Sequence, residues 1–309
     1  MSLVEFPQVQ ALKVSWQRLL KAQRVLVAVT DQSLICCWMR AGQWVWRSGV
    51  LPPDCCRDGV PLLPELIGDF LGELLLDCDL PGAQIELLLP HSACCWRLFE
   101  AGSSEPDQGL AAARSYLAGL QESVEPDDLD VSFQQVGDDW LVVGVPKPVL
   151  QAWIDVADMA DVPLRRVEWS VLTALRTLQR SLAGDWADDL AWVIQASGQQ
   201  GCRLVLVRDG VPEVDRLVRT TDGLSDVIST TASAWRRLDA QTSRPLAWLT
   251  CVADDSLFDV KPWLDAGICD RLLELPMGWV ATPAIPEQET GSLDPFIHLA
   301  FAGLNEVQS

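Results

Sequence analysis

Positive charge is scarce in this sequence. Its 309 residues include 23 Lys and Arg against 43 Asp and Glu, which gives a formal net charge of −20. Binding to nucleic acid requires clustered basic residues, and adsorption to anionic lipid requires them too. The pairs Arg165-Arg166 and Arg236-Arg237 are short. We interpret them as solvated surface or local acid–base pairs, with a phosphate site as the alternative. The composition therefore argues against nucleic acid as a partner.

Histidine is also scarce, and the cysteines lack the spacing of a metal site. The chain has two histidines, His91 and His298, and no C-x-x-C pair among its ten cysteines. Zinc needs Cys or His side chains that converge from characteristic spacings. We therefore expect no metal site. The cysteines are expected to be buried, reduced thiols that behave as small apolar residues in a cytoplasmic protein.

Long apolar runs are absent. The runs Leu87–Leu89 and Leu204–Val207 are far shorter than the ~20 residues that cross a bilayer. The N-terminus has no basic patch followed by an apolar run, so no secretory signal is expected. Residues 12–26 predict a weakly amphipathic helix that leads into a strand. We expect no direct insertion into a membrane.

The sequence motifs of common enzymes are lacking as well. The chain contains no G-x-S-x-G, no G-x-x-x-x-G-K-[ST] and no H-E-x-x-H. Three acid pairs, Asp138-Asp139, Asp188-Asp189 and Asp254-Asp255, resemble carboxylate pairs. Adjacent acids in turns are mostly solvated. We predict no catalytic residue.

What the sequence does contain is an ordered series of short apolar segments. Alternation and turn residues predict strands, and helical spacing of leucines predicts helices. The opening part is predicted to form strands at 24–30, 33–39, 43–50, 83–90 and 93–99, with a helix at 62–78. The next part is predicted to form strands at 129–135, 139–145 and 163–169, with helices at 108–122, from Pro146 to Met159 and at 170–182.

The second half repeats the opening order of three strands and a helix. After Gly184-Asp185 the pattern predicts strands at 189–195, 202–208, 211–217, 246–252 and 270–275, helices at 223–238, 256–266 and 294–304, and a loop at 281–292. Such a repeat indicates a duplicated α/β fold. We predict a first lobe at 1–182 with an inserted subdomain at about 100–162. The second lobe is predicted at 183–309, with a C-terminal helix that returns to the first lobe.

Several short phrases resemble the family of the type IV pilus assembly protein PilM. They are Leu51-Pro52-Pro53 through Asp58-Gly59-Val60, Leu88-Leu89-Pro90-His91-Ser92 with Arg97, 124–129, 162–168, 207–210 and the closing 299–304. Together they cover most of the chain. The resemblance implies the actin-like (ribonuclease H-like) two-lobed fold, with mixed sheets flanked by helices. That fold normally binds ATP between its lobes.

The residues that would bind ATP are mostly replaced in this chain. In the family, each phosphate loop has the pattern Asp-x-Gly. Ala28 stands where the first acid belongs, Thr30 stands where the glycine belongs, and Asp31 is displaced. Gly198 matches the second glycine, but Gln195 or Ala196 replaces its acid, and 249–256 lacks the Gly-Gly turn for adenosine. Without carboxylates that position the metal ion, phosphoryl transfer loses the main electrostatic stabilisation of its transition state. We expect no cofactor, with ATP disfavoured, and no enzymatic activity.

The resemblance then implies a scaffold of a type IV pilus inner-membrane assembly platform. Such a protein lies in the cytoplasm, peripheral to the inner membrane. It binds the cytoplasmic N-terminal tail of a single-span PilN-like partner in a groove of the first lobe. We expect Trp96, Leu98 and Val142 to line that groove, with plain core packing as the alternative. A pilus motor ATPase is a second candidate partner. The open alternatives are an actin-like ATPase with divergent phosphate loops and a cytoplasmic component of a type II secretion platform.

Overall fold

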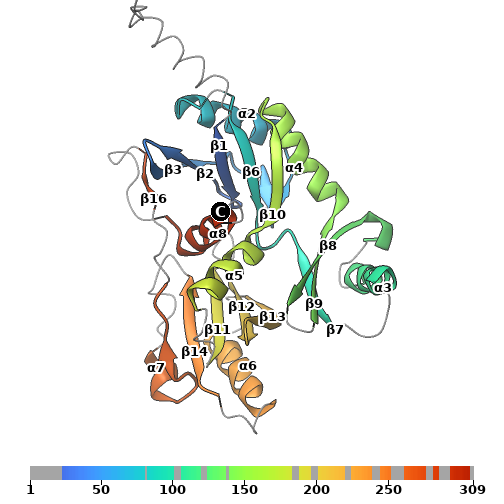
Figure 1. Ribbon diagram of the computed structural model, residues 1–309, viewed down its shortest axis with the longest axis vertical. Coiled ribbons are helices and arrows are strands. Elements are labelled where there is room, and N and C mark those ends of the chain that lie inside the picture. Colours follow the sequence, from blue (N-terminus) through green and yellow to red (C-terminus); the bar gives the residue numbers. More distant parts are fainter. Residues whose placement is uncertain are drawn as a thin grey trace, which may run out of the picture.

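The computed structural model gives two large sheets, a small three-stranded sheet, a two-stranded sheet and the helices that pack on them (Figure 1). It describes residues 23–80, 82–100, 106–119, 124–136, 139–182, 188–195, 201–219, 224–238, 244–251, 261–275, 281–284 and 293–306. Of the segment 12–26, predicted as a helix that leads into a strand, residues 12–22 lie outside the described residues, and residues 24–26 belong to a strand. The predicted lobe boundary at 182/183 lies at the edge of a range that is not described.

The first large sheet has six strands in the order β10-β6-β1-β2-β3-β16. Its strands are β1 (Arg24–Val29), β2 (Ser33–Arg40), β3 (Gln43–Val50), β6 (Gln84–Leu89), β10 (Leu164–Trp169) and β16 (Ala281–Pro283). β1, β2 and β3 form an antiparallel meander, and β6 and β10 add to β1 in parallel. β1 is almost continuously apolar and buried because layers cover both of its faces.

The second large sheet repeats this topology. Its order is β13-β12-β11-β14-β15, formed by β11 (Asp189–Gln195), β12 (Gly201–Arg208), β13 (Val211–Arg219), β14 (Leu246–Cys251) and β15 (Arg271–Leu272). As in the first sheet, the opening three strands are antiparallel and the next two run parallel to the first of them. The predicted duplication is confirmed at the level of strand order.

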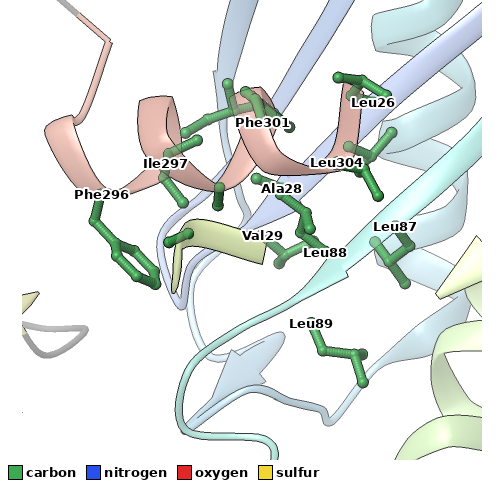
Figure 2. Close-up of a cluster of buried hydrophobic side chains, with 14 of the residues drawn as sticks. Leu26, Ala28, Val29, Leu87, Leu88, Leu89, Phe296, Ile297, Phe301 and Leu304 are labelled. Carbon is green, nitrogen blue, oxygen red and sulfur yellow. The ribbon is translucent and has the colours of Figure 1, made fainter. Parts of the chain in front are cut away.

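Two helices lie between the sheets and join them into one core (Figure 1). These are α5 (Ser170–Ser181) and α8 (Pro295–Glu306). Figure 2 shows Leu304 of α8 close to residues of β1 and β6, whereas Phe296 at the start of the helix points away from them. The Phe296 ring lies 6.0 Å from the ring of Trp192 in the second sheet. The same buried cluster includes Trp192 of β11. Arg24 fixes the end of α8, since it donates hydrogen bonds to the Leu304 carbonyl and pairs with the buried Glu86.

The small sheet has the order β7-β9-β8, formed by β7 (Cys95–Glu100), β8 (Leu129–Val136) and β9 (Asp139–Pro146). The helix α3 (Pro106–Ala118) covers one of its faces. The strand at 93–99 was expected beside the opening sheet, but β7 pairs with β9 instead. α4 (Lys147–Met159) was expected in the insert, yet it packs on α2 (Pro64–Asp77), where a Cβ at Gly68 would touch Met159.

The remaining elements are short or lie at the periphery. They are β4 (Cys56–Arg57), β5 (Val60–Pro61), the 3-10 helix η1 (Pro126–Asp128), α6 (Leu224–Leu238) and α7 (Lys261–Asp265). The loop prediction for 281–292 was wrong at its start, because residues 281–283 form β16 and extend the first sheet beside β3. The expected strand at 270–275 is limited to Arg271–Leu272. Of the predicted helix at 256–266, residues 256–260 lie outside the described residues.

All ten cysteines are free thiols, and eight of them are buried, which agrees with the expected reduced state. No helix within the described ranges has the length and apolar character needed to span a bilayer.

Candidate functional site at the first hairpin and the lobe junction

The turn between β1 and β2 holds Thr30 and Asp31, the residues predicted from the resemblance to stand at the first phosphate loop. A phosphate is held when successive backbone N–H groups point at it. In this turn the N–H groups of Gln32 and Ser33 donate instead to the Thr30 hydroxyl oxygen, at 3.2 and 2.9 Å. The Thr30 N–H donates to the Ser33 carbonyl at 2.9 Å. The threonine oxygen therefore occupies the donors that a phosphate would need.

Asp31 is bonded to a neighbouring loop of its own lobe. Its Oδ1 accepts the N–H of Gly59 at 3.1 Å and lies 3.9 Å from the Cys56 sulfur. Gly59 has a φ of +78°, a left-handed conformation that suits glycine, and Trp153 of α4 donates to its carbonyl. Burial raises the pKa of Cys56 to about 12, and the charge of Asp31 acts in the same direction. Asp31 thus fastens the β4–β5 loop to the first hairpin.

The other positions predicted for nucleotide are only partly described. Gly198 and residues 196–200, between β11 and β12, lie outside the described residues, as do residues 252–256. Leu249 and Cys251 of the expected adenosine turn belong to β14, where both are buried. Within the described part of the chain, no three His, Cys, Asp or Glu side chains are grouped to hold a metal ion.

A network around the His91 carbonyl joins the two lobes. Arg203 of β12 donates to this carbonyl from the second lobe, and Trp169 at the end of β10 donates to it at 3.3 Å. The Arg203 guanidinium lies 5.2 Å from the centre of the Trp169 ring and makes two hydrogen bonds with the Asp215 carboxylate. The His91 ring meets Phe296 of α8 edge-on at 6.2 Å. The arrangement holds both lobes against α8 with almost fully buried groups.

The three residues expected to line the partner groove do not share a surface. Arg97 pairs with Val142 across β7 and β9, and Leu98 pairs with Leu141. Because neighbouring residues of a strand point to opposite faces, Trp96 and Leu98 lie on one face and Val142 lies on the other. Trp96 and Val142 are buried, in two different clusters, whereas Leu98 is half-buried. Of the three, Leu98 alone has substantial exposure.

The sequence analysis missed the junction residue Arg203. A signal was present, since a lone arginine interrupts the apolar run from Cys202 to Val207. A charged side chain in a buried strand needs a partner. The identity of that partner was not accessible, because His91 is 112 positions away in the sequence.

The comparisons with known proteins rest on structure. No protein-family model matches this chain, and no curated protein matches its sequence. The PilM–PilN type IV pilus biogenesis complex is similar over 92% of this chain and 99% of that chain, with a TM-score of 0.66 and 14% identity. The cytoplasmic domain of EpsL, an inner-membrane component of the type II secretion system of Vibrio cholerae, is similar over 93% and 96%, with a TM-score of 0.50 and 14% identity.

A third similar structure is a Bacteroides thetaiotaomicron protein of unknown function whose fold is described as that of an actin-like ATPase. It covers 82% of this chain and 91% of its own, with a TM-score of 0.52 and 8% identity. At these identities the likeness concerns the fold. The repeated strand order, the helices between the sheets and these three similarities together show that this chain has the actin-like, two-lobed α/β fold.

Proposed function

We propose that this chain is a non-catalytic scaffold of an inner-membrane assembly platform, of the type IV pilus or type II secretion kind. One observation carries the proposal: the first phosphate loop is closed by the Thr30 hydroxyl, and Asp31 is bonded to Gly59. A nucleotide phosphate would have to displace the hydroxyl and would find no free carboxylate beside it. The residues at this turn do not fit the β- and γ-phosphates of ATP.

The proposed partner is the cytoplasmic N-terminal tail of a single-span membrane protein. The structure in which PilM is in complex with PilN supports this choice, because its fold covers almost the whole of this chain. We place the tail beside β7, an outer strand of the small sheet, next to the half-buried Leu98. An outer strand offers backbone hydrogen bonds, and a neighbouring apolar side chain adds selectivity. A pilus motor ATPase is a second proposed partner, and the proposed compartment is the cytoplasm.

Isothermal titration calorimetry on the full chain tests both the binding of the tail and the weak binding of ATP. A synthetic peptide with the N-terminal sequence of the co-encoded single-span protein should bind at about 1 µM or tighter, which is near −8 kcal/mol, without nucleotide. Magnesium-ATP should bind with a dissociation constant weaker than ~10 µM, or about −7 kcal/mol.

Two variants locate the tail. Leu98→Asp should weaken binding of the peptide, whereas Leu272→Asp should not, because Leu272 is exposed on β15, at the opposite edge of the second sheet from β13. ATP binding tighter than this limit would favour the divergent ATPase. A folded chain that fails to retain the tail peptide would refute the scaffold. The neighbouring reading frames distinguish a pilus system from a secretion system.

A further inference from the structure

The face of the small sheet that lies under α3 carries two neighbouring pairs of aromatic rings. Tyr116 of α3 meets Phe99 of β7 edge-on at 5.8 Å, and Phe133 of β8 stacks on Trp140 of β9 at 4.6 Å. Phe99 and Trp140 are directly opposite each other across the two strands. These four residues, Phe99, Tyr116, Phe133 and Trp140, are called the aromatic row below.

The aromatic row is accessible to a partner. Tyr116 is 52% exposed and Phe133 is 48% exposed, while Phe99 and Trp140 are half-buried. An aromatic side chain can bury ~150–250 Å² when it is covered, so each exposed ring leaves much apolar area in water. Tyr, Trp and Phe are enriched at the centres of protein–protein interfaces. The composition of the row therefore suits contact with another protein.

Two arginines, one on this face of the sheet and one on α3, have no acidic partner among the described residues. Arg97 lies between Cys95 and Phe99 on β7 and opposite Val142, so it points to the α3 side of the sheet. Arg114 lies on α3, one turn before the buried Ala118. In both residues Nε is buried and has no hydrogen-bond partner, although the side chains as a whole are half-buried. No ion pair among the described residues includes either arginine.

This situation differs from that of the other half-buried arginines. Three of them each face a carboxylate, in the pairs Arg24–Glu86, Arg176–Glu168 and Arg208–Asp189, and the buried Arg203 faces Asp215. A chain with a net charge of −20 has ample acid to pair two more. Leaving guanidinium groups partly desolvated and unpaired has a free-energy cost. A carboxylate from outside the chain would remove that cost, since arginine binds carboxylates in a planar, two-pronged geometry.

We propose that the aromatic row, together with Arg97 and Arg114, is a docking surface for a segment of another protein in which acidic residues alternate with apolar ones. The apolar side chains would cover the aromatic row, and the carboxylates would pair with the two guanidinium groups. The long-range repulsion of a −20 chain disfavours a polyanion such as nucleic acid, whose charge is dense along its whole length. This surface is on the opposite face of the sheet from Leu98, so it is separate from the proposed tail site.

The single tyrosine of the chain allows a direct test. Full-length protein labelled with 3-fluorotyrosine has one ¹⁹F resonance, which comes from Tyr116 in the aromatic row. A short peptide in which Asp and Glu alternate with Leu should shift this resonance saturably. The matched peptide with Asn and Gln in place of the acids should bind about tenfold more weakly, because charge-assisted hydrogen bonds are lost.

Substitutions of the two arginines test whether they bind the carboxylates of the peptide. Arg97→Gln and Arg114→Gln should each weaken binding of the acidic peptide by about tenfold. Arg40→Gln should leave it unchanged, since Arg40 is exposed at the end of β2 in the first sheet. Phe133→Ser serves as a further variant at an exposed position, should Arg97→Gln fail to fold. The proposal is overturned if no peptide gives a saturable shift. Preference for a Lys–Leu peptide or a single-stranded oligonucleotide, or equal affinity in the arginine variants, would overturn it as well.

Discussion

Gly303 sets the closest approach between α8 and α5, and its replacement should separate them. A Cβ built at Gly303 would lie 1.8 Å from the Thr173 carbonyl oxygen and 2.9 Å from the Thr177 hydroxyl. Both obstacles belong to α5, and the nearer one is backbone, which cannot rotate away. Gly303→Ala must therefore move one helix by roughly 1.5 Å to restore an ordinary contact of ~3.4 Å.

The expected loss of stability follows from what α8 buries. Phe296, Ile297, Leu299, Phe301 and Leu304 of this helix are almost fully buried in the core shared by the lobes. A radial gap of ~0.5–1 Å already removes a quarter to a half of a dispersion contact. Overpacking in cores costs about 1–3 kcal/mol and sometimes more. The gain of ~1 kcal/mol in helix propensity from glycine to alanine offsets part of it. We expect a net loss of about 2 kcal/mol.

Gly72 in α2 provides the matched control. It is also a glycine inside a helix, but a Cβ there would lie 3.7 Å from the Ala160 carbonyl oxygen, an ordinary contact. Gly72→Ala should therefore stabilise the protein by about 0.5–1 kcal/mol through helix propensity alone. Urea denaturation followed by the fluorescence of the 14 tryptophans measures both variants. Equal stability of Gly303→Ala and the wild type would refute the close packing of α5 and α8.

Three further predictions concern the junction, the start of α8 and the thiols. Arg203→Met leaves the Asp215 carboxylate unpaired and should lower the free energy of unfolding by about 3 kcal/mol. The double variant with Asp215→Leu should regain part of the loss, and a double variant less stable than Arg203→Met would contradict the pairing. Burial raises the pKa of Asp294 above its usual value, although the hydrogen bonds from the Ile297 and Phe296 N–H groups act to lower it. A raised folded-state pKa gives stability that is complete below the unfolded pKa and lost as the pH rises through the folded value. Asp294→Asn keeps the accepting oxygen without the charge, so its stability relative to wild type should increase as the pH rises above about 4, and a flat difference in urea titrations would contradict this. Thiol titration of denatured protein without reductant should find close to ten groups, and a count of four or fewer would contradict the reduced state.

Most of the regular elements could be predicted from the sequence because their signals are local. Helical spacing within 62–78 and alternation within 129–145 depend only on neighbouring residues. The turn Ala41-Gly42 is an example, since both residues take positive φ and return β2 directly into β3. The repeated order of three strands and a helix also indicated the duplicated fold, because two segments with the same order of elements are expected to pack into the same layers.

Pairing between distant segments was decided only by the tertiary structure. β7 follows β6 closely in the sequence, yet it joins β9, and nothing local distinguishes the two outcomes. β16 has three residues, too few to show alternation, and it forms because the edge of β3 is available. The faces of Trp96 and Val142 depend on the register between β7 and β9, and a shift by one residue would exchange them.

Some functional features could likewise be predicted from the sequence, and others depend on the tertiary structure. The sequence by itself, through its resemblance to the PilM family, predicted that Thr30 stands at the position of a glycine and that Asp31 is displaced from the position of the acid. Only the tertiary structure decided that the Thr30 hydroxyl takes the turn's own N–H groups and that Asp31 reaches Gly59, 28 positions away. It also decided that Arg203 pairs with a carboxylate, while the Nε atoms of Arg97 and Arg114 have no hydrogen-bond partner in the described part of the chain. Residue identity is a property of the chain, but the partner of a polar group is set by which segments the folded core brings within a few ångströms of it.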